Sequence, residues 1–295
     1  MQPTSFAGAQ RPTFVSVQVS EARRYYLDLA PPPGRKLSVV CGGCERIRPD
    51  YRVERQTFPF FAIEFVAEGE GILELAGRQY RLKPGMAFAY GPGIPHIIRS
   101  DGTGRPMLKY YVDFTGTDAK AILEQSPLGA WEAVQVSSPK EVIELLEMIQ
   151  REGGSESSYG ALICALLVPV VILKITERAV PCGTGELRSL ATYQRVKQWI
   201  ESHYKTINSI GQVAGACGVE PAYLSRLFQR FGHTTPYRFL MRLKMNRAAE
   251  LLLDGGLMVK EVASELDFAD AFHFSRAFKR IYGIPPERFL KSSRG

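Results

Sequence analysis

Two stretches of the chain place arginine and other polar side chains on one face of a helix, at matching positions. The first runs from Tyr223 to Phe231 and the second from His273 to Ile281. In both, apolar residues recur at i, i+3, i+4 and i+7, the spacing of one buried helix face. The opposite face carries Ser and Arg in the same order. An arginine there could donate two hydrogen bonds to guanine or bind a phosphate, so these faces are candidates for contact with nucleic acid.

A short apolar segment and a turn precede each of these helices at nearly the same distance. The first turn contains Gly218 and the second Asp267, residue types that tolerate left-handed backbone geometry. Either helix alone would be equally consistent with an ordinary amphipathic surface helix. Because the whole arrangement occurs twice, the sequence predicts two helix-turn-helix units.

The net charge belongs to the part of the chain that holds these helices. Residues 191–295 contain 16 Lys and Arg and 9 Asp and Glu, whereas residues 1–190 contain 21 of each group. The formal charge of +7 therefore lies in the C-terminal third. Such a basic domain indicates a polyanionic partner, most commonly nucleic acid.

Patterns elsewhere divide the chain and predict an α+β fold. Short apolar runs between Gly and Pro turns indicate an antiparallel β-barrel, and one long helix from Pro236 to Leu253 joins the two helix-turn-helix units. The expected parts are an irregular N-terminal arm at 1–36, the barrel at 37–137, a helical dimerisation or packing segment at 138–180, a linker at 181–188 and an all-α domain at 189–295.

The helical segment contains two apolar helices, the second from about Tyr159 to Arg178. Their apolar surface is expected either to pair with a second copy of the chain or to pack on the barrel. The run from Ala161 to Leu173 is interrupted by Pro169 and is too short for a membrane span, so we read it as a buried helix. No signal peptide pattern begins the sequence. We expect a cytoplasmic protein without a membrane partner.

Residues 190–290 closely resemble the DNA-binding domain of AraC-type transcription regulators. The motifs that carry the resemblance are Tyr223–Phe228, Arg242–Lys244 with Ala248 and Leu251-Leu252, Val262-Ala263, Phe268, Phe274–Lys279, and Gly283 with Pro285-Pro286 and Phe289. The resemblance implies that the second helix of each unit enters the major groove of double-stranded DNA. A homodimer is expected, and RNA polymerase is a further expected partner.

The family pattern also implies which outward positions reach DNA. Arg226 and Arg276 are the principal expected base readers, while Arg230, Lys279 and Arg280 are expected at phosphates, which position the protein without specifying sequence. The expected base-facing positions are Ala222, Ser225, Arg226 and Gln229 in the first unit and Ala271, Phe272, Ser275 and Arg276 in the second.

Residues 48–114 resemble, less closely, the cupin-type sensing barrel of the same family. Gly69-x-Gly71, Pro84-Gly85, Pro92-Gly93-x-Pro95-His96 and Val112-x-Phe114-x-Gly116 carry this resemblance. It implies a pocket for a small-molecule effector, in this family often a sugar or related metabolite. The pocket is expected near Arg55, Ile98, Lys109 and Tyr111, although Lys109 and Ile98 depart from the usual sugar pocket. His96 is either a hydrogen-bonded turn histidine or a further pocket residue.

Two other functions stay open at this point. The barrel could serve only for dimerisation or partner docking in a constitutive regulator, or it could be a cupin enzyme. Such an enzyme would need two His and a carboxylate on an early strand and a later His, but residues 55–65 contain no His. Cys41-x-x-Cys44 also lacks a second pair at zinc-site spacing. We expect no catalytic residue, metal or cofactor.

Overall fold

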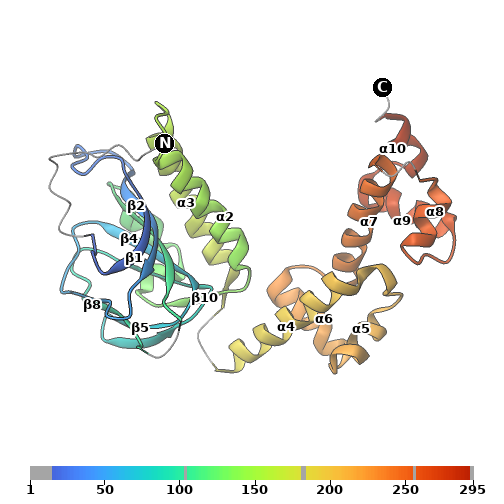
Figure 1. Ribbon diagram of the computed structural model, residues 1–295, viewed down its shortest axis with the longest axis horizontal. Coiled ribbons are helices and arrows are strands. Elements are labelled where there is room, and N and C mark those ends of the chain that lie inside the picture. The colour runs from blue at the N-terminus through green and yellow to red at the C-terminus, as the bar shows by residue number, and fades with distance from the viewer. Residues whose placement is uncertain (1–14, 103–104, 181–183, 255–256, 293–295) are drawn as a thin grey trace. The chain divides into compact units, whose positions relative to one another are not determined.

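The chain forms two compact units, the N-terminal unit (Met1–Cys182) and the C-terminal unit (Gly183–Gly295). The computed structural model describes residues 15–102, 105–180, 184–254 and 257–292. Figure 1 shows β-strands in the N-terminal unit and a succession of helices in the C-terminal unit. The predicted α+β architecture, a β-rich domain followed by a helical one, is confirmed.

The N-terminal unit contains two antiparallel sheets in its described residues. The larger sheet has the strand order β1 (Val19–Tyr26), β2 (Ser38–Ile47), β9 (Leu108–Thr115), β4 (Phe61–Glu68), β7 (Met86–Tyr90), β10 (Val134–Val136) and β11 (Ala179–Val180). The smaller sheet has the order β3 (Arg52–Arg55), β8 (His96–Ser100), β5 (Gly71–Leu75) and β6 (Arg78–Leu82).

Each face of the larger sheet has its own hydrophobic core. One face packs on the smaller sheet, and side chains such as Phe58, Leu73 and Phe88 fill the space between the sheets. The other face is covered by α2 (Pro139–Gly153), α3 (Gly160–Arg178), α1 (Ala119–Glu124) and the short helix η1 (Pro127–Ala130). Figure 1 shows α2 and α3 side by side along the strands. Because the central strands are buried on both faces, they read as apolar runs without alternation.

Part of the predicted irregular arm is a strand. Val19–Tyr26 forms β1, which pairs antiparallel with β2, so the prediction is wrong for these residues; residues 1–14 lie outside the described part. β1 buries only Tyr25 and lies at the edge of the sheet. Main-chain pairing and the ion pair of Arg24 with Glu45, at 2.7 Å, hold it in place. No apolar alternation marks such a strand in the sequence.

Helix α3 is not wholly buried, contrary to the reading of its apolar run. Cys164, Val168 and Val171 face the core. The opposite side forms an apolar stripe whose side chains are 42–64% exposed: Leu162, Leu166, Val170 and Leu173. By length and composition the helix could also cross a membrane, a test that core helices of soluble proteins pass as well. It therefore offers an apolar surface with no partner within the described unit.

The C-terminal unit contains the two predicted helix-turn-helix units. Its helices are α4 (Thr184–His203), η2 (Tyr204–Thr206), α5 (Ile210–Cys217), α6 (Pro221–Gly232), α7 (Pro236–Asp254), α8 (Val259–Glu265), α9 (Ala271–Tyr282) and α10 (Pro286–Ser292). Gly218 and Asp267 adopt the expected left-handed geometry, with φ of 62° and 55°. Helix α4 begins at Thr184, so residues 184–188 of the expected linker are helical, and residues 181–183 lie outside the described part.

Helix α7 belongs to both halves of the C-terminal unit. In its first half, Phe239 packs on Phe228 of α6, with ring centroids 5.6 Å apart. In its second half, Met245 and Ala248 enter the core that contains Phe278 of α9. One rigid helix is therefore fixed against both second helices.

Candidate functional site

Helices α6 and α9 bury one face and expose the face that was predicted to bind DNA. α6 begins with Pro221 at its first position. Asp270 immediately precedes α9, and its carboxylate accepts a hydrogen bond from the His273 amide at 2.6 Å. These starts fix which residues point outward. Of the eleven predicted DNA-contacting residues, Ala271 and Ser275 are half-buried and the other nine are exposed.

The basic side chains on this face differ in their ion-pair and hydrogen-bond partners. Arg276 and Lys279 form no ion pair with any described residue. Arg230 pairs with Glu186 of α4 at 2.6 Å, and Arg280 donates a hydrogen bond to the Tyr237 hydroxyl at 3.2 Å. An exposed ion pair stabilises by only about 0.2–1 kcal/mol. Arg230 can therefore exchange Glu186 for a phosphate at small cost.

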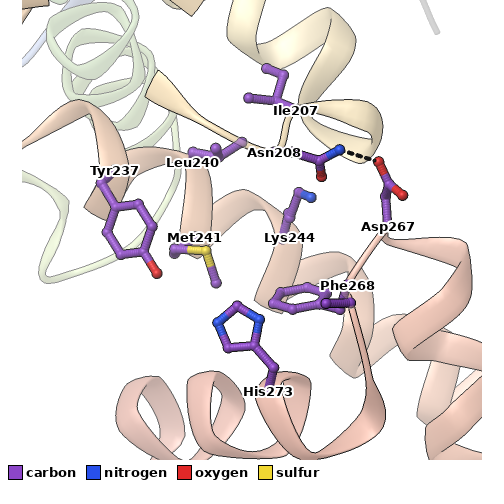
Figure 2. A pocket seen from close by; sticks show the side chains of 10 residues that line it. Ile207, Asn208, Tyr237, Leu240, Met241, Lys244, Asp267, Phe268 and His273 are labelled. Carbon is purple, nitrogen blue, oxygen red and sulfur yellow. Dashed lines mark hydrogen bonds between the residues drawn. The ribbon is translucent and has the colours of Figure 1, made fainter. Parts of the chain in front are cut away.

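A cleft of about 290 Å³ lies between α7, the segment that precedes α5 and the turn that precedes α9. Figure 2 shows side chains from α7 on one side and from the α8–α9 turn and His273 on the other. At its edge the Asn208 amide donates to the Asp267 carboxylate at 2.8 Å. Below them the buried Lys244 donates to the Leu266 carbonyl at 2.8 Å, and burial lowers the pKa of Lys244. Asn208 and Lys244, which lie outside the second helix-turn-helix unit, thus hold the turn that precedes α9.

A polar cavity lies between the two sheets of the N-terminal unit. It has a volume of about 20 Å³ and is lined by Val15, Ser16, Glu45, Tyr51, Arg55, Phe58, Glu64, Tyr90, Lys109, Tyr111 and Asp113. Three of the predicted pocket residues, Arg55, Lys109 and Tyr111, meet here. Strand register explains this, because Glu45 lies opposite Lys109 and Glu64 lies opposite Tyr111 on neighbouring strands.

The other two predicted pocket residues lie elsewhere. Ile98 is fully buried in the apolar core between the sheets. His96 stacks on Tyr90, with ring centroids 3.8 Å apart, and its Nδ1 lies 3.1 Å from the Ile94 carbonyl oxygen. Burial lowers the pKa of His96. His96 and Arg55 also line a separate pocket of about 390 Å³ on the smaller sheet.

A charged network fills most of the cavity wall. The buried Lys109 ammonium lies 2.9 Å from Glu64 and 3.6 Å from Glu45. Burial opposes its charge, but the two carboxylates outweigh this effect and hold the pKa of Lys109 above its usual range. The Tyr90 hydroxyl donates to Glu64 at 2.7 Å, and Arg24 completes the network at Glu45. These charges neutralise one another within the wall.

Two polar groups in the same wall are not satisfied by the described residues. The Tyr111 hydroxyl and one carboxylate oxygen of Asp113 are buried without a hydrogen-bond partner among them. The other oxygen of Asp113 accepts a hydrogen bond from the Cys41 thiol at 3.2 Å, and burial raises the pKa of Asp113 to about 7. Buried polar groups are rarely left unpaired, so these two are suited to bind a polar ligand.

Sequence reasoning missed several cavity residues, namely Glu45, Tyr51, Glu64, Tyr90 and Asp113. A signal was present for two of them. Glu64 and Asp113 each interrupt an apolar strand run with one charge. A charge at such a position must face a polar interior site or destabilise the sheet.

The two neighbouring cysteines do not form a metal pair. Cys41 contacts Asp113 near the cavity, whereas Cys44 lies in the core on the opposite face of the sheet. Among the residues that the structure describes, no group of three His, Cys, Asp or Glu side chains could hold a metal ion.

Asp113 should give the N-terminal unit a measurable pH dependence. Its folded pKa exceeds the value of about 4 in an unfolded chain, so its contribution to stability falls as pH rises from about 4 to about 7, by up to about 4 kcal/mol. Asp113→Asn should remove this fall. We would compare thermal unfolding of both proteins from pH 5 to 8.

The control for this comparison is Glu124→Gln on the exposed side of α1. The lowered pKa of His96 gives a slope of opposite sign, which both variants retain, so the difference from wild type isolates Asp113. An Asp113→Asn profile parallel to that of the wild type would show that Asp113 has an ordinary pKa.

Family models match each unit separately. A model described as AraC-like ligand binding domain matches residues 43–153, and a helix-turn-helix domain model matches residues 213–292. The first match contains the strands that form the cavity. The second contains helices α6 to α10.

Whole-length relatives are regulators of operons. The Msm operon regulatory protein of Streptococcus mutans is 24% identical over 86% of this chain and 92% of its own length. The raffinose operon regulatory protein RafR of Pediococcus pentosaceus is 24% identical over 86% and 94%, respectively. Among solved structures, the C-terminal domain of AraT from Geobacillus stearothermophilus is 29% identical and covers 34% of this chain and 84% of that one, with a TM-score of 0.33.

The two models match the β-rich unit and the paired helix-turn-helix units in the order in which the structure has them. Two operon regulatory proteins align along most of the chain. This protein therefore belongs to the AraC-type family of DNA-binding transcription regulators.

Proposed function

We propose that this regulator binds operator DNA through α6 and α9 and changes its DNA binding when a small polar metabolite occupies the cavity of the N-terminal unit. The observation that carries the proposal is the buried polar wall of that cavity. A sheet-packing core needs no buried Lys109, and burying charges is costly unless they are paired. The Tyr111 hydroxyl and one carboxylate oxygen of Asp113 can also form hydrogen bonds that no described residue supplies.

A sugar or related polyhydroxylated compound fits this wall best. Its hydroxyl groups both donate and accept hydrogen bonds, as do the Tyr111 hydroxyl and the carboxyl of Asp113 when it is protonated. Names of relatives support the same class, because they include regulators of raffinose and lactose operons. RNA polymerase contact and a cytoplasmic location belong to the same proposal.

The cavity must open to admit such a ligand. Its volume of about 20 Å³ is room for little more than one water molecule. Val15 and Ser16 form part of its wall, and the Ser16 carbonyl accepts a hydrogen bond from Arg24 at 2.7 Å. The ligand would therefore favour a second arrangement of the N-terminal segment, and only that difference can shift DNA binding. The small volume also supports the alternative, a constitutive regulator whose barrel serves dimerisation alone.

On DNA, one protomer would cover two neighbouring segments of the major groove. Since α7 is packed against both α6 and α9, the two helices would enter the groove about one turn apart, roughly 34 Å. In this arrangement Arg226 and Arg276 read bases, while Arg230, Lys279 and Arg280 bind phosphates.

The exposed apolar stripe of α3 supports a homodimer. Leu162, Leu166 and Leu173 are each more than half exposed, and burying such a side chain contributes about 1.5–3 kcal/mol. The same stripe on a second protomer is its simplest complement. Two protomers would then present four helix-turn-helix units to one operator.

The cavity should bind its ligand through the Tyr111 hydroxyl. At about 100 times its dissociation constant, a bound sugar would stabilise the N-terminal unit by roughly 2.7 kcal/mol. We would screen pentoses, hexoses, deoxy sugars and uronic acids by thermal unfolding. Tyr111→Phe should keep the ligand-free melting temperature but lose the ligand shift. Tyr159→Phe, at an exposed tyrosine, should keep both; an unchanged shift in Tyr111→Phe would remove Tyr111 from the site.

The Asn208–Asp267 bridge should position the second recognition helix. Asp267→Gly removes the carboxylate but suits the left-handed backbone, whereas Asp267→Asn keeps an acceptor for Asn208. We expect Asp267→Gly to weaken binding up to about tenfold on DNA with both groove segments. Binding to a duplex that holds only the first segment should not change. Equal losses on the two duplexes would assign the bridge to general stability, and Asp267→Asn should resemble the wild type.

The α3 stripe should hold the dimer together. Leu166→Glu places a charge in the proposed interface and should raise the dimer dissociation constant at least about 100-fold, since an unpaired buried charge costs several kcal/mol. Sedimentation equilibrium measures this constant. Lys120→Gln on exposed α1, which changes the net charge by the same amount, is the matched charge control. A Leu166→Glu protein that remains as dimeric as the wild type would exclude this interface.

A further inference from the structure

Phe272 is the most exposed large apolar side chain among the described residues, at 82%. It is the second residue of α9, the helix that enters the major groove in the function proposed above. We propose that Phe272 reads sequence by contacting the C5-methyl group of a thymine. This inference rests on the proposed role of α9 and names a specificity determinant within it.

The position of Phe272 on α9 suits contact with a base edge. The helix buries Phe274, Ala277 and Phe278, so Phe272 lies on the outer side. Arg276 follows one turn later, at i+4, and the two side chains are neighbours on the helix surface. In helix-turn-helix proteins the N-terminal residues of the recognition helix reach base edges. Phe272 therefore lies at the base-reading end, while Arg280 lies near the opposite end of the helix.

The chemistry of the ring limits what it can recognise. A phenyl group neither donates nor accepts conventional hydrogen bonds, so it cannot read the polar groups of the base edges. The thymine methyl is the one apolar group that a base edge presents in the major groove. The ring would thus distinguish thymine from cytosine and from both purines at one position.

Comparison of the two helix-turn-helix units indicates what this contact would distinguish. Ser225 and Arg226 of α6 are matched by Ser275 and Arg276 of α9, so these residues would read the same bases in both segments. At the position of Phe272 the first unit has the exposed Ala222, whose methyl group reaches much less far. The contact of Phe272 would therefore distinguish the groove segment bound by α9 from the segment bound by α6. It would set the direction in which a protomer lies on its operator.

Replacing thymine by deoxyuridine removes only the methyl group and tests the proposal directly. With the full-length protein, an operator would first be obtained by selection from random DNA. Each thymine would then be replaced singly. We expect one replacement in the α9 segment to weaken wild-type binding about fourfold, the loss of one methyl contact. Phe272→Ala should weaken binding to the thymine operator by a similar factor and be insensitive to that replacement.

Two further results make the test specific. Phe272→Leu keeps an apolar side chain and should still prefer thymine to deoxyuridine. Because Phe272 is exposed, none of the variants should lower the melting temperature. If Phe272→Ala is as sensitive to the replacement as the wild type, or weakens binding to all sequences alike, Phe272 does not read a thymine methyl. If selection yields no preferred sequence, the proposed function of α6 and α9 fails instead.

Discussion

Helix α7 is packed into two hydrophobic cores at once, and the proposed recognition of two groove segments depends on that constraint. Phe239 anchors its first half to α6, and Met245 anchors its second half in the core that includes α9. A helix has a fixed rise per residue, so α7 sets the distance between the two helix-turn-helix units that pack on it. The Asn208–Asp267 hydrogen bond and the ion pair of Lys205 with Glu265, at 3.2 Å, then limit rotation of one helix-turn-helix unit against the other.

The N-terminal unit uses a different constraint, a charged cluster inside a sheet. Strand register places Glu45, Lys109 and Glu64 on one face of three neighbouring strands, where they satisfy one another. Replacing such a cluster by apolar residues often leaves a protein equally stable or more stable. In the function proposed above, its role is to bind the ligand. Because Arg24 of β1 also joins the cluster, a ligand that disturbs it would act on the N-terminal segment directly.

The sequence predicted the helices better than the sites, for physical reasons. Periodicity and turn residues such as Gly218 are local signals, and they located both helix-turn-helix units. Strand β1 gave no such signal, because its stability comes from pairing with a distant segment. Arg55, Lys109 and Tyr111 were placed by family resemblance. Ile98 was not brought to the cavity, because its side chain fills the apolar core between the sheets. Glu64 could have been found from its charge within an apolar run.

The claim that one protomer reads two groove segments through a shared helix is tested most directly by methylation protection of guanine N7 on a selected operator. A monomeric variant or a single-protomer site would be used, so that each signal belongs to one chain. We expect two protected clusters on the same face of the DNA, about one helical turn or 10–10.5 base pairs apart. Arg226→Ala should remove one cluster and Arg276→Ala the other. A single protected cluster, or two that vanish together with either substitution, would contradict it.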